Sequence, residues 1–274
     1  MGRLRELAKK CRELGKEGAD NPDAPAVADE DGDGEHAEWV KIGLLLLREE
    51  IGKPLRRCED YLNEMPGSLE VFELETSPDH TSFWNWEKEF PTRRLRSLLR
   101  SSAEQAGVSG TAAIDASGFQ RDQTSSHYRK RAGYSFRKLK TTLLVDTESL
   151  AIMDAHFTTK KAYDGHIGLQ VFRRNAEDLR KLLADKMYSW GELREECREG
   201  STRPVIKHCE QTPLQKAHNA RIDDDLYHQW TMSETVFSLL KGGDGEKLRS
   251  RSWHGQFREL MRKCIVHNLS RAVG

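Results

Sequence analysis

The sequence lacks the features that mark membrane, secreted and zinc-binding proteins. Its longest aliphatic run, Ile42 to Leu47, is far shorter than the roughly 20 apolar residues of a membrane-spanning helix, and Met1 to Gly15 is charged where a signal peptide would be apolar. The five cysteines are odd in number and show neither a Cys-x-x-Cys pair nor nearby histidines at zinc-site spacing. We therefore expect free thiols, no membrane partner and a cytoplasmic location.

Net charge is also missing, because 44 Lys and Arg residues balance 44 Asp and Glu residues. The balance hides an uneven distribution. Glu17 to Glu38 holds nine acidic residues and no Lys or Arg, whereas Arg93 to Lys140 holds eleven basic residues against three acidic ones. A basic strip of this kind indicates either a surface that lies along phosphates or an ordinary solvated face, and charge alone leaves both interpretations open.

The first 36 residues predict a charged helix followed by a flexible acidic linker. Leu4 to Leu14 has helical spacing, and the stretch after it has too little apolar surface to build a core. The acidic cluster Asp29 to Glu35 lacks the glycine and the terminal glutamate of a calcium loop at the required offsets. We interpret it as solvated linker.

Residues 37–107 predict a small all-helical domain. An amphipathic stripe runs from Trp39 to Leu62 with an interruption near Gly52 to Pro54, and two further helices are expected from the Asp79 cap to Phe90 and from Thr92 to Gly107. Such a domain is typical of helix-turn-helix DNA-binding proteins, but many inert helical bundles have the same pattern.

The pattern changes after Gly110, where residues 108–274 predict an α/β domain. The expected elements are a strand at 111–116, a hairpin of strands at 140–145 and 150–157, helical structure at 167–183, an extended piece at 204–207 and helix from about 224 to the end. This organisation is typical of a catalytic domain behind a helical module.

Three carboxylates stand out in this second part of the chain. Asp115 ends a strand of small and β-branched residues, Asp185 follows the stretch Leu179 to Ala184, which we assign to helix, and Glu234 lies on a later helix. At 100° per residue, Glu234 shares one helix face of roughly 60° with Tyr227, Trp230 and Lys241. Two hard cations need oxygen ligands of this kind, with positions left open for water and phosphate, although each piece alone is equally consistent with a surface ion pair or a strand end.

These residues resemble the insertion-sequence DDE transposases with the signature Tyr, two residues, Arg, three residues, Glu, six residues, Lys. The final motif is similar to Tyr227 to Lys241, the first acidic motif to Ile114 to Phe119, and the second to Leu183 to Tyr188. Residues 44–48 and 78–84 resemble the family's helical N-terminal domain, so that the similarity covers most of the chain.

The resemblance implies an RNase H-like mixed sheet with flanking helices, preceded by the small helical DNA-binding domain. Asp115 would bridge two Mg²⁺ ions, with Mn²⁺ as a substitute, and Asp185 and Glu234 would each complete one metal site. Tyr227, Trp230 and Lys241 would lie along the DNA backbone. Within the helical domain, four arginines are expected to contact phosphates: Arg93, Arg94, Arg96 and Arg100.

The implied function is that of a nucleoid-associated DNA transposase. It would bind the terminal inverted repeats of an insertion sequence and catalyse metal-dependent strand cleavage and strand transfer into target DNA, as a dimer in the synaptic complex. Two other interpretations stay open: a catalytically impaired relic that only binds DNA, and a resolvase or ribonuclease that uses the same core on branched or hybrid substrates.

Three positions depart from the family pattern. Trp230 stands where Arg is expected, Met187 where Gly is usual, and Ser189 where Asp is usual. An indole lacks the bidentate guanidinium that grips phosphate, and Trp230 is interpreted either as a residue that stacks on a base or as core packing. Met187 is expected to strain its turn if that position needs positive φ.

Overall fold

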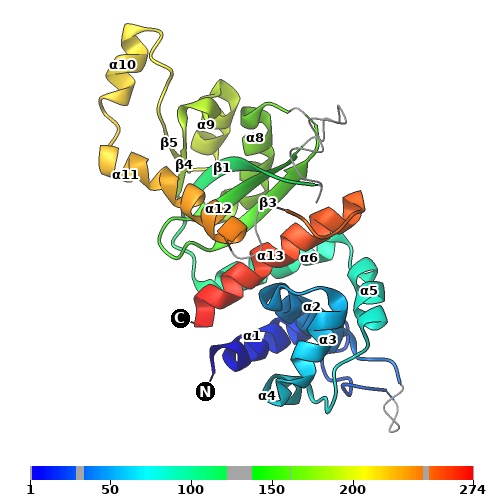
Figure 1. Ribbon diagram of the computed structural model, residues 1–274. Coiled ribbons are helices and arrows are strands. Elements are labelled where there is room, and N and C mark those ends of the chain that lie inside the picture. Colours follow the sequence, from blue (N-terminus) through cyan, green and yellow to red (C-terminus); the bar gives the residue numbers. More distant parts are fainter. Residues whose placement is uncertain (1, 29–33, 122–137, 161, 243–246, 274) are drawn as a thin grey trace, which may run out of the picture. The chain divides into compact units, whose positions relative to one another are not determined.

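The computed structural model describes residues 2–28, 34–121, 138–160, 162–242 and 247–273. It divides into two compact units, one formed by residues 1–106 with 250–274 and the other by residues 107–249 (Figure 1). Most of the acidic cluster, at 29–33, and much of the basic strip, at 122–137, lie outside the described residues.

The first unit is helical. Its elements are α1 (Arg3–Gly18), α2 (Glu38–Ile51), α3 (Leu55–Asn63), α4 (Pro66–Leu69), the short 3₁₀ helix η1 (Glu70–Phe72), α5 (His80–Glu89), α6 (Thr92–Ala106) and α13 (Trp253–Val273). The predicted helices at 39–62, 79–90 and 92–107 are confirmed. Gly52 in the left-handed conformation ends α2, and the Asp79 side chain caps α5 through the Thr81 amide.

Close helix packing in this unit depends on two glycines. Gly15 of α1 faces the Trp39 carbonyl on α2, and Gly43 of α2 faces the Phe72 ring and the Cys11 carbonyl, so that a Cβ at either glycine would clash. Because both side chains are single hydrogens, α1 and α2 approach closely and bury Cys11 and the surrounding leucines.

The last helix of the chain completes the helical unit. Helix α13 packs against α6, α2 and α1, and its Arg262 donates to Glu49 at 2.8 Å and to Glu87 at 3.0 Å. Arg48 also pairs with Glu87, and the Arg262 and Glu49 side chains are only 3% and 1% exposed. A buried ion-pair network therefore ties α13 to helices from the beginning of the chain.

The two units divide at 106/107, one residue from the boundary predicted at 107/108, whereas no division occurs near the boundary predicted at 36/37. Helix α1 packs on α2 within the same compact unit, and residues 250–274 group with the helical unit by their contacts, although the sequence predicts them in the catalytic domain. The reason is that α13 has buried positions on several sides, including Glu259, Leu260 and Arg262, and needs surrounding helices to cover them.

The second unit is α/β. Its strands are β1 (Thr111–Phe119), β2 (Leu139–Asp146), β3 (Ile152–Thr158), β4 (Lys181–Ala184) and β5 (Arg203–Ile206). Its helical elements are α8 (Asp164–Asn175), η2 (Ala176–Asp178), η3 (Lys186–Tyr188), α9 (Gly191–Glu199), α10 (Pro213–Asn219), α11 (Asp224–His228), η4 (Gln229–Thr231) and α12 (Met232–Gly242).

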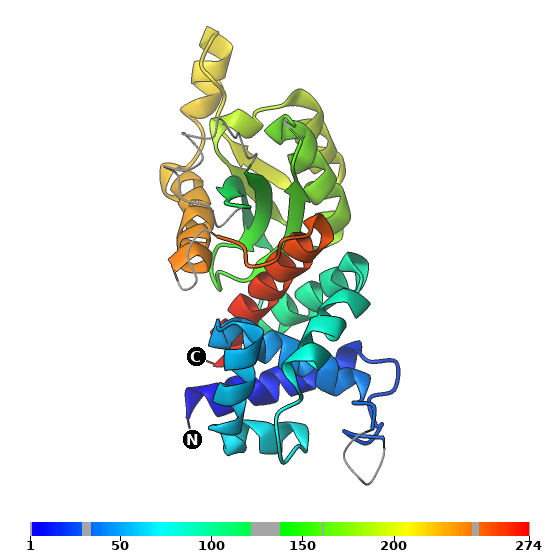
Figure 2. The same ribbon diagram turned by 45° about the vertical axis from the view of Figure 1, so that its right-hand side comes forward.

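The five strands form one mixed sheet in the order β3-β2-β1-β4-β5. Strands β1, β2 and β3 are antiparallel neighbours, whereas β4 and β5 run parallel to β1. Figure 2 shows helices α8 and α9 on one side of the sheet and the α11 to α12 segment on the other. This three-layer arrangement, with a helical region before it in the chain, is consistent with the predicted RNase H-like fold.

One assignment made from the sequence is wrong in this unit. The helix expected across 167–183 ends at Asn175, and Lys181 to Ala184 form strand β4. Leu182, Leu183 and Ala184 are good helix formers, but the edges of β1 and β5 pair with this segment on both sides. Asp185 therefore follows a central parallel strand instead of a helix.

Candidate active site

Asp115 and Asp185 are placed by adjacent parallel strands. Asp115 lies in the middle of β1, which continues to Phe119, and not at the end of a strand as the sequence predicts. Ile114 and Ala184 form the last pair between β1 and β4, and Asp115 and Asp185 directly follow them. Ala113 and Leu183, two residues earlier, are buried in one cluster with Tyr227. Since side chains two residues apart on a strand share a face, both carboxylates project toward the layer formed by α11, η4 and α12.

Glu234 comes from that layer. Tyr227 lies on α11, Trp230 on the 3₁₀ turn η4, and Glu234 in the first turn of α12, which packs against β1 and β2. The expected single helix is thus interrupted by one 3₁₀ turn. Tyr227 and Trp230 pack on the cluster of Ala113 and Leu183, while Glu234 is exposed.

Lys241, at the end of α12, reaches the strand that carries the first aspartate. Its amine donates to the Ser117 hydroxyl at 2.8 Å, and it lies 5.4 Å from the centre of the Phe119 ring. Ser117 is two residues from Asp115 on β1 and therefore on the same face of the sheet. A cation is thus anchored beside the carboxylates.

The three predicted acids are near enough to act on one another electrostatically. Burial, together with the charges of Asp185 and Glu234, raises the pKa of Asp115 from its ordinary value to about 6, against a hydrogen bond from the Ala116 amide. The pKa of Asp185 is also raised, mainly by burial, although the Met187 amide donates to its Oδ1 at 2.8 Å. No salt bridge to Asp115, Asp185 or Glu234 is present among the described residues.

This donor set fits divalent cations. Several carboxylates held together without a salt bridge repel one another and lose hydration, and a hard cation with oxygen ligands offsets both costs. Among the described residues, the ligand atoms of Glu59, Asp79 and His80 in the helical unit lie within 4.8 Å of one another. The three predicted acids do not form so compact a group.

A fourth acid near the site was not predicted from the sequence. The charge of Asp164, the first residue of α8, raises the pKa of both Asp115 and Asp185. Its Oδ1 lies 2.5 Å from the amine of Lys140, which also donates to the Ala162 carbonyl. The only sequence signal was an acid in the first turn of a helix, which is common in helices of every function.

An open cavity of about 440 Å³ lies beside Asp185. Apart from Asp185 itself, it is lined by charged, polar and aromatic side chains: Lys186, Lys207, His208, Cys209, Glu210, Asn219, Tyr227 and Trp230. The burial of Tyr227 and the charge of Asp185 raise the pKa of its hydroxyl, which places this side chain near the acid as well.

The three departures from the family pattern take different structural forms. Trp230 is packed on the Ala113 cluster and lines the cavity, so that core packing accounts for much of its surface. Met187 is exposed and does not have positive φ, and the strain expected at this position is therefore absent. Ser189 accepts a hydrogen bond from the guanidinium of Arg194 at 3.2 Å.

The arginines predicted to contact DNA lie on α6 in the helical unit and differ in their surroundings. Arg94 donates to the Gly18 carbonyl and pairs with Glu38 at 2.5 Å and Asp20 at 3.2 Å, so its guanidinium is already engaged. Arg93 is exposed, and Arg100 is half exposed with a long 3.7 Å contact to Glu104. Arg96 is partly buried.

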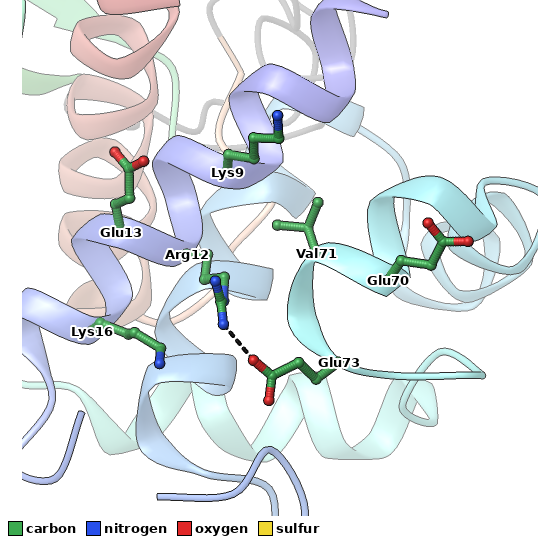
Figure 3. Close-up of a pocket in the computed structure, with 7 residues that line it drawn as sticks. All are labelled: Lys9, Arg12, Glu13, Lys16, Glu70, Val71 and Glu73. Atoms are coloured by element: carbon green, nitrogen blue, oxygen red, sulfur yellow. Dashed lines mark hydrogen bonds and ion pairs between the residues drawn. The ribbon is translucent and has the colours of Figure 1, made fainter. Parts of the chain in front are cut away.

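A separate cleft in the helical unit lies between α1 and η1. Figure 3 shows Lys9, Arg12 and Lys16 on α1 opposite Glu70 and Glu73, with Arg12 paired to Glu73. Because its basic and acidic side chains alternate and pair, this cleft has no excess of one charge and contains none of the three predicted catalytic acids.

Comparisons with known proteins bear on the sheet unit and on α13. A family model described as a transposase DDE domain matches residues 107–269. A search of curated proteins found no match. Within the described residues, every helix is too short or too polar to cross a membrane.

Proposed function

The chain belongs to the family of proteins that carry a transposase DDE domain, and we propose from this premise that it cleaves and joins DNA at the ends of an insertion sequence. In this proposal Asp115, Asp185 and Glu234 are the three acids of the DDE site. The observation that supports it is the electrostatic coupling of Asp115 on β1 to Asp185 at the end of β4 and to Glu234 on α12, with no salt bridge to any of the three among the described residues.

Each acid has a distinct part in this proposal. Bound divalent ions, Mg²⁺ or Mn²⁺, would supply Lewis acidity to an in-line phosphodiester displacement by water or a 3′-hydroxyl. Asp115, held on a central strand, would contribute oxygens to both ions, whereas Asp185 and Glu234 would each complete one. The Met187 amide fixes one oxygen of Asp185, which leaves its other oxygen for a metal.

Two further residues position the DNA backbone. Lys241 is anchored by Ser117 beside the acids, where its charge favours a phosphate next to the scissile bond. The Tyr227 hydroxyl stays protonated and can donate to the same strand, since its pKa is raised above its ordinary value. Contacts to the DNA backbone position the substrate without reading its sequence, so both side chains would fix its register.

Recognition of the terminal inverted repeats is assigned to the helical unit. Arg93 and Arg100 are its exposed candidates for phosphate contacts, while Arg94 and Arg96 sit deeper on the same helix. In the full proposal, two copies of the chain hold the two ends in a synaptic complex at the nucleoid of the cytoplasm. The subgroup with the Tyr-Arg-Glu-Lys signature stays a prediction, because Trp230 occupies the Arg position.

The test uses a supercoiled plasmid that carries the gene with its flanking DNA. We expect the purified full chain to nick the plasmid at the element ends in Mg²⁺ and not in EDTA. Asp115→Asn should lower cleavage by at least a thousandfold while end binding stays within about threefold, by analogy with other groups that act in the transition state. Asp225→Asn, an exposed aspartate of the same unit, is the matched control and should cleave normally.

A relic that only binds DNA is the second candidate, and Trp230 is the observation that favours it. The indole is packed on the Ala113 cluster and offers one donor and no charge where the signature has a guanidinium. Metal-independent end binding without any nicking would select the relic. Cleavage that follows branched or hybrid structure instead of the terminal sequence would select a resolvase or ribonuclease.

A further inference from the structure

The wall of the cavity beside Asp185 carries the carboxylates of Asp185 and Glu210, the latter accepting from Asn219, and also basic groups that the DDE site does not use. Lys186 follows Asp185 directly, and no carboxylate pairs with its amine within the described part of the chain. The Lys207 amine lies 2.6 Å from Asp224 and 4.6 Å from the centre of the Tyr227 ring. His208 completes this side of the cavity, and its backbone is held by Asn219.

Behind this wall lies a buried guanidinium that has no carboxylate partner among the described residues. Arg194 of α9 is 4% exposed, and it donates from Nη2 to the Ile206 carbonyl at 2.7 Å and to the Ser189 hydroxyl at 3.2 Å. Its Nε and Nη1 have no hydrogen-bond partner among the described residues. A buried, unpaired charge is costly, and an anion in reach of its field lowers that cost.

Ser189 connects the guanidinium to the cavity. Its hydroxyl accepts from Arg194 and lies 3.1 Å from Nδ1 of His208, whose ring lies 4.7 Å from that of His218. Burial, and then the positive charge of Arg194, lower the pKa of both histidines, so the field of Arg194 reaches the cavity wall at His208. Where Ser189 stands, an Asp would have cancelled the charge of Arg194.

We propose that this cavity is an anion site that binds one backbone phosphate of a DNA strand, with Lys186, Lys207 and His208 on its wall and Arg194 behind them. The inference rests on the proposed function for the identity of the strand, because the cavity opens beside Asp185 and therefore beside the scissile phosphate. The phosphate next along the strand enters the cavity, and the serine at 189 keeps Arg194 available to attract it.

The experiment measures thermal unfolding of the full chain in EDTA, with phosphate exchanged for chloride at constant ionic strength. Phosphate should raise the Tm by about 2–4 °C. Ser189→Asp should raise the Tm without phosphate, by pairing with Arg194, and remove the phosphate effect. Lys186→Gln should remove most of the effect without stabilising the chain. Ser201→Asp and Lys181→Gln, which make the same charge changes elsewhere in the unit, should behave as the unaltered protein.

A second arm separates DNA from free phosphate. By fluorescence anisotropy in EDTA, Ser189→Asp and Lys186→Gln should each weaken binding of an end duplex about fivefold relative to their controls, as expected for the loss of one phosphate contact. A phosphate effect without a change in DNA binding would overturn the proposal in favour of a site for the free anion. Equal phosphate shifts in all variants, or no shift at all, would also overturn it.

Failure of the anion site and failure of the transposase function give different results. A chain that shows the phosphate effect but never cleaves its flanking DNA keeps the anion site and loses the proposed function. A chain that cleaves in Mg²⁺ but is insensitive to phosphate and to both substitutions keeps the function and loses the anion site.

Discussion

At the scale of single residues, the candidate site combines groups that destabilise the metal-free protein. Asp115 is partly buried beside other acids, and its raised pKa means that the folded chain binds a proton at this carboxylate more tightly than the unfolded chain does. The ionised aspartate therefore opposes folding above about pH 6, and the penalty fades as the pH falls toward its ordinary pKa. Such a cost is tolerated where a ligand of opposite charge binds.

Asp115→Asn should accordingly stabilise the metal-free chain. Removing the charge while keeping the shape relieves both the desolvation and the repulsion by Asp185 and Glu234, and we expect a gain of about 1–3 kcal/mol in the free energy of unfolding at pH 7. Denaturant unfolding in EDTA measures it. The same substitution should abolish stabilisation by added Mg²⁺; a variant that is less stable in EDTA, with Mg²⁺ stabilisation unchanged, contradicts the assigned role.

Sequence motifs predict these acids but not the residues around them. Asp115, Asp185 and Glu234 come from three distant segments, and only a family pattern connects them before the fold is known. Asp164, Arg194 and His208 carry no motif, because their importance depends on which strand ends and helix ends meet in space. Ser189 was noticed as a departure, yet its consequence for a buried arginine required the structure.

At the scale of elements, hydrophobic periodicity predicted the helices of the helical unit and the β2–β3 hairpin, but it predicted neither α9 nor α10 and assigned β4 to a helix. The hairpin has a local cause: Asp146 accepts hydrogen bonds from the Glu148 and Ser149 amides and fixes the turn. Strand β4 is four residues long and becomes a strand only because β1 and β5 lie on either side. Short buried apolar runs cannot be assigned from periodicity alone.

Helix α6 offers a test of which arginines contact DNA. Arg93→Ala and Arg100→Ala should each lower the log-log slope of end binding against salt by about 0.9, the value for one neutralised phosphate on duplex DNA. Arg94→Ala should leave the slope unchanged and lower stability, because its guanidinium is engaged with Glu38 and the Gly18 carbonyl. Anisotropy titrations across a salt series measure the slopes; identical slopes for all three variants would remove α6 from the interface.

Helix α13 offers a second test, this time of stability. Glu49→Ala leaves the buried Arg262 with only Glu87 and should cost about 2–4 kcal/mol of unfolding free energy. Glu70→Ala removes an exposed pair with Arg5 and should cost less than about 1 kcal/mol. Chemical denaturation compares the two, and equal losses would mean that the α13 network does not hold the helical unit together.

At the scale of the whole molecule, the two compact units are not two consecutive segments of the chain, because the helical unit contains both its beginning and its end. The family match runs from residue 107 to residue 269, through the sheet unit and into α13, which is packed in the helical unit. No periodicity or motif in the sequence shows that the last helix returns to the first ones, since that contact is long-range. The unit to express for DNA-binding studies is therefore the full chain, and the fragment 37–107 lacks both α1 and α13.

A fragment comparison tests this composition. Residues 37–107 alone should show little cooperative unfolding. In the full chain α13 covers a face of α2 and a face of α6, and α1 covers another face of α2, so all three faces would be exposed in the fragment. Circular dichroism during thermal unfolding measures it, with the full chain as the reference. A sharp transition of the isolated fragment would show that the sequence-based boundaries were sufficient.

The central claim is that Asp115, Asp185 and Glu234 bind divalent metal together, and anomalous diffraction from crystals grown with Mn²⁺ tests it most directly. We expect one or two anomalous peaks within roughly 2.0–2.3 Å of carboxylate oxygens of these three residues, and, where two ions bind, a separation of roughly 4 Å between them. Peaks only at Glu59, Asp79 and His80, the compact cluster of the helical unit, with none at the three acids, would contradict it.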